Sequence, residues 1–204
     1  MTSNAAESQA RHFDAMFQRE ADPWHTRTRW YERRKRALIL AALPHERYER
    51  AFEPGCGAGE TTVCLAPRCA SLVACDASAA AVQRTRARLG PASGVVLHQA
   101  RMPQDWPAGS FDLVLICELG YYLCAGNLAR LADACRGSLS ARGTLLACHW
   151  RRAEPDMLQD ATQVHALLEQ RTGMRRLSHY EDDDFLLDVW SGDPCSVARR
   201  GEPA

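Results

Sequence analysis

Several features that would suggest a function by themselves are missing from this sequence of 204 residues. The 25 basic and 25 acidic residues give a formal net charge of zero, which argues against a nucleic-acid-binding surface. No apolar run reaches the roughly 18 residues needed to cross a membrane. The N-terminal residues lack the basic and apolar regions of a signal peptide. The sequence therefore predicts a cytoplasmic protein that binds neither nucleic acid nor membrane.

Paired metal or disulfide motifs are also absent. The nine cysteines include no CxxC pair, and the histidines show no HxxxH spacing. Buried cysteine behaves as a small hydrophobic residue, so we expect reduced core cysteines and no metal site. Lysine is nearly absent as well, since Lys35 is the only one.

The composition and length indicate one folded domain over residues 1–204. Apolar residues make up 46% of the chain, which excludes a disordered protein. We expect residues 1–8 and 192–204 to be flexible and residues 10–44 to form an N-terminal helical cap.

Short apolar runs alternate with helical segments along the chain, which is typical of an α/β fold. Strands are predicted at 51–53, 72–75, 95–98, 111–117 and 143–150, helices at 60–66, 79–89, 127–139 and 160–172, and a final hairpin at 176–180 and 185–190. The run at 111–117 is almost wholly apolar, as expected of a parallel strand covered on both faces. Upstream, Pro44 ends a predicted helix that starts near residue 28.

The most informative stretch is the glycine turn Glu53-Pro54-Gly55-Cys56-Gly57-Ala58-Gly59. It follows a predicted strand and opens a helix, where free N–H groups suit an anionic or carboxylate-bearing ligand. Glycine permits positive φ and close approach of the backbone to a ligand. The GxGxG spacing differs from the dinucleotide-binding pattern GxGxxG.

Asp76 ends the second predicted strand, about 20 residues after the first glycine, where an acid accepts hydrogen bonds from ribose hydroxyls. The alternative is that Asp76 caps the next helix. Ser78 fills that capping role at least as well, which favours the ribose hypothesis.

These residues resemble the class I S-adenosylmethionine-dependent methyltransferases, through Glu53–Gly59, Asp76 and Phe111-Asp112-Leu113-Val114. The chain more narrowly resembles the nodulation protein S branch. The motifs that carry this resemblance are Asp22-Pro23-Trp24, Arg29-Trp30-Tyr31-Glu32-Arg33-Arg34-Lys35, Asp105-Trp106-Pro107, Glu118-Leu119-Gly120-Tyr121-Tyr122-Leu123, His149-Trp150-Arg151 and Asp184-Phe185-Leu186-Leu187-Asp188-Val189-Trp190.

The resemblance implies a Rossmann-like sheet of seven strands in the order 3-2-1-4-5-7-6, with strand 7 antiparallel, helices on both faces and an N-terminal helical lid. It implies S-adenosyl-L-methionine as cofactor, with the glycine turn at the methionine part and Asp76 at the ribose. The expected cofactor-binding residues are Trp24, Tyr31, Arg34, Glu53, Gly55, Cys56, Gly57, Asp76, Ala77, Arg101, Met102 and Glu118. The family's usual acid after the third strand is missing, so either Asp105 reaches the adenine or backbone or water holds its amino group.

Arg34 lies on an apolar helical stripe with Tyr31 and Leu38, which suggests a buried charge partner such as the cofactor carboxylate. The alternative is that residues 33–36 form a solvated basic face. The segment from Trp24 to Tyr31 is expected to form a lid over the site.

Glu118 and His149 follow neighbouring predicted strands and are the catalytic candidates. His149 has the pKa range of a general base, and Glu118 has acceptor oxygens that suit an amine. The alternatives are a structural His149 beside Trp150 and a Glu118 that caps the following helix or contacts the N-terminal lid. The expected substrate-binding residues are Tyr121, Tyr122, Trp150 and Arg151, with aromatic faces that suit sugars and ammonium groups.

Nodulation protein S methylates the free amine of a deacetylated chitin oligosaccharide. The resemblance therefore implies an N-methyltransferase for a small-molecule amine, with an amino sugar or oligosaccharide as one candidate. O- or S-methylation, a nicotinamide-dependent oxidoreductase and a non-catalytic cofactor-binding protein remain as alternatives.

Overall fold

The computed structural model describes residues 3–91 and 94–200, with side chains from residue 7 onward. Its centre is a seven-stranded sheet in the order β3-β2-β1-β4-β5-β7-β6. The strands are β1 (Tyr48–Pro54), β2 (Cys69–Asp76), β3 (Val95–Gln99), β4 (Phe111–Cys117), β5 (Leu139–Trp150), β6 (Arg175–Glu181) and β7 (Phe185–Ser191). Only β7 runs antiparallel to its neighbours β5 and β6, whereas the other pairs are parallel. The expected strand order and the direction of strand 7 are confirmed.

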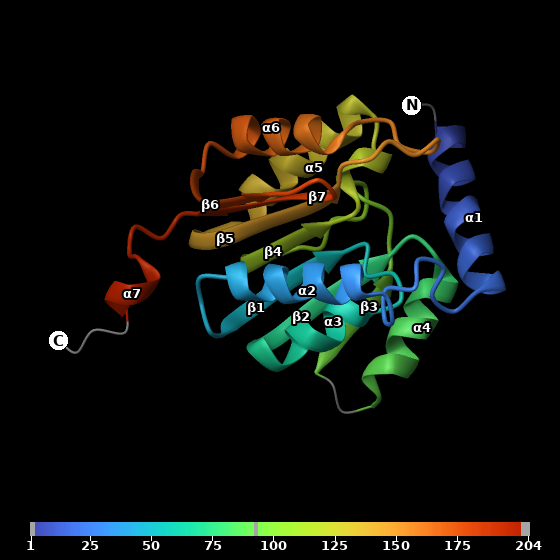
Figure 1. Ribbon diagram of the computed structural model, residues 1–204, viewed down its shortest axis with the longest axis horizontal. Coiled ribbons are helices and arrows are strands. Elements are labelled where there is room, and N and C mark those ends of the chain that lie inside the picture. Colours follow the sequence, from blue (N-terminus) through green and yellow to red (C-terminus); the bar gives the residue numbers. More distant parts are fainter. Residues whose placement is uncertain (1–2, 92–93, 201–204) are drawn as a thin grey trace.

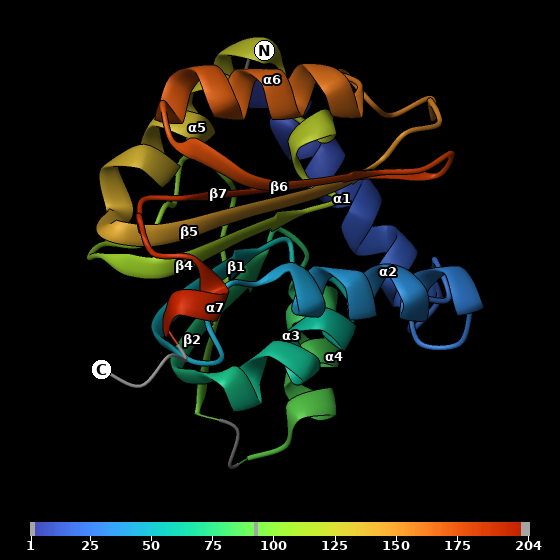
Figure 2. The ribbon, with the colours of Figure 1, turned by 60° about the vertical axis from the view of Figure 1, so that its left-hand side comes forward.

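Helices cover both faces of the sheet, with α5 and α6 on one side and α2, α3 and α4 on the other (Figure 2). The helices are α1 (Ser3–Arg19), α2 (Trp30–Ala42), α3 (Glu60–Leu65), α4 (Ala79–Leu89), α5 (Ala125–Ser138), α6 (Ala161–Thr172) and α7 (Val197–Arg200), with 3-10 turns η1 (Ala66–Arg68) and η2 (Gly120–Tyr122). Helix α1 belongs to neither layer and lies beyond the carboxyl ends of the parallel strands (Figure 1). None of the described helices is long and apolar enough to span a bilayer.

Strand β4 shows why the sheet needs helices on both sides. Val114 and Ile116 are buried in the cluster that contains α5 and α6 side chains, whereas Leu113 and Leu115 are buried in the cluster that contains α2 and α3 side chains. Alternate side chains of a strand point to opposite faces. The unbroken apolar run therefore supplies both cores.

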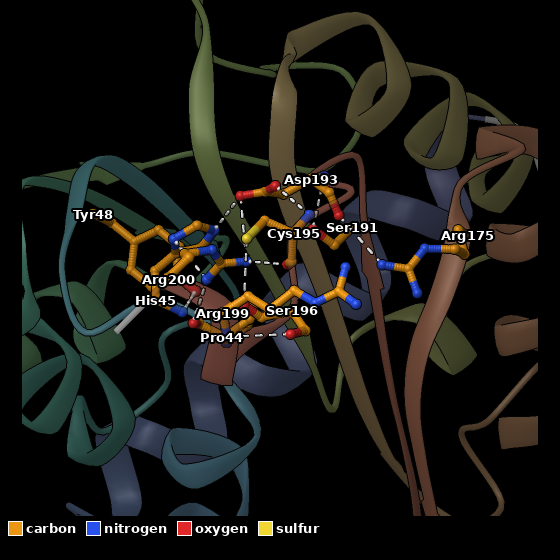
Figure 3. A network of polar contacts seen from close by, with 10 residues as sticks. All are labelled: Pro44, His45, Tyr48, Arg175, Ser191, Asp193, Cys195, Ser196, Arg199 and Arg200. Atoms are coloured by element: carbon orange, nitrogen blue, oxygen red, sulfur yellow. Dashed lines mark hydrogen bonds and ion pairs between the residues drawn. The ribbon is translucent and has the colours of Figure 1, made fainter. Parts of the chain in front are cut away.

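Both chain ends show more structure than the sequence suggests. Helix α1 begins at Ser3, within the segment expected to be flexible, and residues 1–2 lie outside the described part. Near the other end, Arg200 Nη1 donates to the Pro44 carbonyl at 2.7 Å and Nη2 lies 3.2 Å from Asp193 Oδ2 (Figure 3). Residues 192–200, expected to be flexible, thus contact the turn between α2 and β1. Residues 201–204 lie outside the described residues.

Arg200→Ala is expected to lower the Tm by about 2–4 °C, because it removes hydrogen bonds worth about 1 kcal/mol to the carbonyls of Pro44 and Cys195. Thermal unfolding followed by circular dichroism measures the shift. Arg199→Ala is the matched control, since Arg199 is exposed in the same helix. Equal Tm values for the two variants would show that the contacts of Arg200 contribute nothing to stability.

Candidate functional site

A cavity of about 750 Å³ lies at the carboxyl ends of the parallel strands. Its walls come from the segments that follow β1, β2, β3, β4 and β5 and from α1 and α2. Open α/β sheets bind ligands at this edge, and the volume is that of a small-molecule or cofactor site.

Helix α1 closes one side of the cavity. Asp14 Oδ1 accepts hydrogen bonds from Ser78 Oγ at 2.6 Å and from the Ala80 N–H at 3.1 Å. Gln9 Nε2 donates to the Tyr122 carbonyl at 3.0 Å, and Phe17 is buried. These contacts attach α1 to the start of α4 on one side and to η2 on the other.

The glycine turn after β1 has the predicted conformation. Gly55, Gly57 and Gly59 have φ values of 74°, 53° and 81°, which side-chain-bearing residues rarely adopt. A Cβ on Gly59 would also lie 2.9 Å from Thr85. The turn therefore needs glycine, and Gly55 and Gly57 lie in the cavity wall.

Asp76 connects this turn to the end of β2. Its Oδ2 accepts the Gly57 N–H at 3.0 Å and its Oδ1 accepts the Ser78 N–H at 2.9 Å. Burial raises the pKa of Asp76, while these N–H donors lower it. Ser78 caps α4 by accepting the Ala81 N–H at 3.0 Å, so Asp76 is not the helix cap.

Glu53 is the most deeply buried acid of the cavity wall, with 3% of its surface exposed. Burial raises the pKa of Glu53 to about 7, while the nearby Thr62 hydroxyl lowers it. Its Oε2 atom has no hydrogen-bond partner among the described residues. An unpaired buried carboxylate oxygen is costly, so this site suits a ligand that carries a cation or a hydrogen-bond donor.

Lys35 is buried in the cavity wall, a position that the sequence did not suggest. Its Nζ lies 2.7 Å from Glu118 Oε1 and 3.1 Å from Glu32 Oε2. Although burial works in the other direction, the two carboxylates raise the pKa of Lys35 well above its ordinary value. The buried positions of α2 are Lys35 and Ile39. One feature of the sequence could have indicated this position: the only lysine lies four residues, about one helical turn, after Tyr31.

Glu118 joins three elements of the site. Besides Lys35 on α2, its carboxylate accepts the Trp150 N–H of β5 at 3.0 Å and a hydrogen bond from the Tyr121 hydroxyl of η2. Its backbone has a φ of 51°, which is unusual for a side-chain-bearing residue. Glu118 lines the cavity and does not cap α5, whose N-cap residue is Cys124.

His149 does not fit the role of a catalytic base. The side chain is fully buried, and its Nε2 accepts the Gly120 N–H at 3.0 Å. Its Nδ1 lies 2.9 Å from His165 Nε2. Both nitrogens are therefore occupied by protein groups, and His149 does not line the cavity, which favours the structural alternative for this residue.

Two predicted arginines also lie outside the cavity wall. Arg34 Nη1 lies 2.8 Å from Asp182 Oδ2 in the hairpin between β6 and β7. Arg151 Nη2 lies 2.7 Å from Glu181 Oε1 in the same hairpin. The acidic hairpin is the nearer partner for both guanidinium groups, so neither reaches the cavity.

The other predicted site residues all line the cavity: Trp24, Tyr31, Glu53, Gly55, Cys56, Gly57, Asp76, Ala77, Arg101, Met102, Glu118, Tyr121, Tyr122 and Trp150. Asp105 lies outside this wall, with its Oδ2 accepting the Arg101 N–H at 2.8 Å. Gln104 lines the cavity in its place. In the part of the chain that the structure describes, no cluster of three or more potential ligands could hold a metal ion.

The sequence comparison decides the family. Residues 10–143 match the family model of nodulation protein S (NodS). The chain belongs to the NodS family. Nodulation protein S of Rhizobium tropici is 32% identical over 114 residues, which cover 55% of this chain and 47% of that protein. The Bradyrhizobium diazoefficiens protein is 33% identical over 103 residues, covering 50% of this chain and 49% of that one. The matched part thus spans about half the length of these NodS proteins.

Solved structures share the fold. A candidate methyltransferase from Pseudomonas syringae is 53% identical, with a TM-score of 0.71, and the match covers 80% of this chain and 99% of that one. The N-methyltransferase NodS from Bradyrhizobium japonicum WM9, solved with S-adenosyl-L-homocysteine, is 24% identical with a TM-score of 0.80. That match covers 88% of this chain and 97% of the other. The class I methyltransferase fold predicted for this NodS family member is confirmed.

Proposed function

We propose that this protein is an S-adenosylmethionine-dependent methyltransferase that methylates an amine on a small molecule. The observation that carries the proposal is the unpaired Oε2 of Glu53 in the wall beside the glycine turn. A cofactor with an amino-acid ammonium group supplies the donor that this oxygen lacks. The NodS structure solved with S-adenosyl-L-homocysteine supports the same choice of cofactor.

The cavity wall offers a partner for each part of this cofactor. Glu53 suits the ammonium group, and Asp76 keeps lone pairs for the ribose hydroxyls. The cofactor carboxylate suits Arg36, which lines the cavity in place of Arg34. The orphaned hydroxyl of Tyr31 is a second donor in the wall.

The adenine end lies after β3. Met102 supplies apolar surface, and the side-chain amide of Gln104 has both a donor and an acceptor. Both residues line the cavity, whereas Asp105 does not. We assign to Gln104 the acceptor role for the adenine amino group that an acid fills in many relatives of this class.

The cofactor would supply an electrophilic methyl group on a sulfonium. Transfer breaks the sulfur–carbon bond, forms a nitrogen–carbon bond and releases a proton from the acceptor amine. The protein contributes mainly alignment and exclusion of water, and alignment alone supplies roughly 7–11 kcal/mol in well-oriented systems. Glu118, at the end of β4, is placed to accept a hydrogen bond from the amine and orient its lone pair.

Aromatic and acidic side chains support an amine as acceptor. Tyr121, Tyr122 and Trp150 line one part of the cavity together with Glu154 and Asp156. Glu154 and Asp156 lie close enough to Tyr122 to raise its pKa, after burial as the main cause. Aromatic faces and carboxylates attract cationic amines. The acceptor amine can thus be held before it loses its proton.

Two experiments test this function. Calorimetric titration should show binding of S-adenosyl-L-homocysteine and none of NAD; the opposite result would indicate an oxidoreductase. A methyl-transfer assay across amines, amino sugars, phenols and thiols should then show turnover with amines. Turnover with phenols or thiols alone would favour O- or S-methylation instead.

Asp76→Ala is expected to weaken S-adenosyl-L-homocysteine binding by roughly ten- to 150-fold, because hydrogen bonds to a charged group contribute about 1.5–3 kcal/mol. Calorimetry measures the change. Asp112→Ala is the matched control, since Asp112 also accepts two backbone N–H groups, from Glu49 and Arg50, yet lies outside the cavity wall. Unchanged affinity in Asp76→Ala would remove Asp76 from the cofactor site.

A further inference from the structure

A buried chain of hydrogen bonds leads away from the acceptor turn, which we define as residues 118–122. The Gly120 N–H donates to His149 Nε2 at 3.0 Å. His149 Nδ1 lies 2.9 Å from His165 Nε2, and His165 Nδ1 lies 2.7 Å from Asp188 Oδ2. His149, His165 and Asp188 are at most 4% exposed. None of the three lines the cavity, so their effect on the site must pass through the acceptor turn.

The first contact fixes the proton positions along this chain. A backbone N–H can only donate, so His149 Nε2 accepts and carries no proton. The proton of neutral His149 is then on Nδ1 and is donated to His165 Nε2. His165 therefore carries its proton on Nδ1 and donates it to Asp188. Burial lowers the pKa of His149 well below its usual range, which keeps this imidazole neutral.

The hydrogen-bond chain ends at Asp188, which acts as an ionised acceptor. Asp188 Oδ1 lies 2.8 Å from His179 Nδ1 and 3.5 Å from Arg176 Nη1. Burial raises the pKa of Asp188, but hydrogen bonds from His165 and His179 outweigh burial and lower it. Because arginine is always cationic and only donates, its position favours an oxygen on the Oδ1 side of residue 188.

The His149 end of the hydrogen-bond chain is closely packed against the acceptor turn. A Cβ on Gly120 would lie 2.5 Å from Val164 Cγ1 and 3.1 Å from His149 Nε2. The His149 ring also meets the Tyr121 ring edge-to-face, with centroids 5.2 Å apart. The same turn carries Glu118, Tyr121 and Tyr122 into the cavity wall. A shift of Gly120 would therefore move the groups that face the acceptor.

We propose that His149 is a positioning residue that sets the acceptor turn, and that His165 and Asp188 act through it by fixing its tautomer. The effect on catalysis rests on the proposed function, because the acceptor turn matters for turnover only if an acceptor binds there. The tautomers themselves do not depend on the reaction.

We call the hydrogen bonds from Asp188 through His165 and His149 to the Gly120 N–H the relay. Asp188→Asn is the variant that tests it. Arg176, whose Nη1 lies 3.5 Å from Asp188 Oδ1, favours the amide oxygen of the new side chain at that position, which turns the NH₂ group towards His165 Nδ1. His165 then carries its proton on Nε2 and donates to His149 Nδ1, which moves the His149 proton to Nε2. Two donors, His149 Nε2–H and the Gly120 N–H, then face each other, and the hydrogen bond to the acceptor turn is lost.

NMR of ¹⁵N-histidine- and ¹⁵N-glycine-labelled protein measures the histidine tautomers and the Gly120 amide signal without any acceptor bound. Wild-type His149 should be the Nδ1–H tautomer. In Asp188→Asn it should become the Nε2–H tautomer, with a shifted Gly120 amide signal. An Nε2–H tautomer in the wild type would overturn the proposal, and so would unchanged signals in Asp188→Asn. Failure of the proposed methyl transfer, by contrast, would leave these signals as expected.

Kinetics then test the consequence for the site. Asp188→Asn should raise the KM for the acceptor amine or lower kcat by roughly ten- to a hundredfold, as expected for a lost buried hydrogen bond. The affinity for S-adenosyl-L-homocysteine should not change. His179→Gln is the matched control, because His179 contacts the other oxygen of the same carboxylate and should leave turnover near wild type. An equal loss in His179→Gln would overturn the proposal.

A rescue variant separates positioning from general destabilisation. His149→Gln presents an amide oxygen where Nε2 lies, so it can still accept the Gly120 N–H without a relay to Asp188. This variant should keep most of its turnover, and adding Asp188→Asn to it should cause little further loss. Full additivity of the two changes would overturn the relay.

Discussion

Lys35→Met is expected to lower the free energy of unfolding by about 3 kcal/mol. Removing one partner of a buried ion pair leaves an uncompensated charge and costs about 3–5 kcal/mol. The lower end applies because Glu118 keeps 29% of its side chain exposed. Glu32 and Glu118 would then lie in the cavity wall without the lysine between them.

Chemical denaturation of Lys35→Met and of the double variant Lys35→Met/Glu118→Gln measures this effect. The double variant should be less destabilised than the sum of the single changes, since it removes the charge that Lys35 balances. Arg33→Met is the matched control, because Arg33 is exposed on the same helix. A loss in Arg33→Met as large as that in Lys35→Met would contradict the assignment of a buried ion pair.

The affinity for S-adenosyl-L-homocysteine is expected to rise about tenfold between pH 6 and pH 8, as Glu53 loses its proton. Burial places the pKa of Glu53 at about 7 in the cofactor-free protein, so its carboxyl is mostly neutral at pH 6. Pairing with an ammonium group requires the carboxylate, so binding releases a proton below the pKa. Glu53→Gln should remove this pH dependence and weaken binding at pH 8 by roughly ten- to a hundredfold.

The same pKa has a consequence for stability in the cofactor-free protein. A folded-state pKa of about 7, above the ordinary value of 4.5, favours the folded state most below pH 4.5. This contribution is lost as the pH rises through about 7. Glu53→Gln should therefore be more stable than the wild type above pH 7, by up to about 3 kcal/mol.

Glu60→Gln serves as the control for both measurements. Glu60 also lines the cavity and is buried, but its Oε1 is paired with Arg27 and Arg88 at 2.9 Å and 3.0 Å. The pH dependence of binding should therefore persist in Glu60→Gln. If the affinity of the wild type did not change with pH, or if Glu53→Gln kept the pH dependence, Glu53 would not be the partner of the cofactor ammonium.

Much of the fold and the cofactor end of the site could be predicted because they depend on local rules. The apolar run of β4 and the final hairpin indicated the sheet, and the family resemblance supplied the strand order. Gly55 and Asp76 lie at strand ends, and parallel strands bring their carboxyl ends to one edge. These residues meet in the structure for that reason.

The acceptor end could not be predicted in the same way. Adjacent β5 residues point to opposite faces of the sheet. Trp150 reaches the cavity, and His149 turns towards α6, where Val164 and His165 are buried. The sequence His149-Trp150 does not indicate which of the two side chains faces the ligand. A catalytic base and a structural histidine were therefore equally compatible with the sequence.

The sequence by itself determined the glycine turn, the acid after β2 and the alternation of strands and helices, since each depends on backbone conformation or on a short periodicity. Tertiary structure alone decided that Lys35 and Arg36 of α2 line the cavity and that Arg34 does not. Arg34 and Lys35 are neighbours and differ by about 100° around the helix axis. The acidic hairpin 181–184 draws Arg34 away, and Glu32 and Glu118 hold the only lysine of the chain against the cavity.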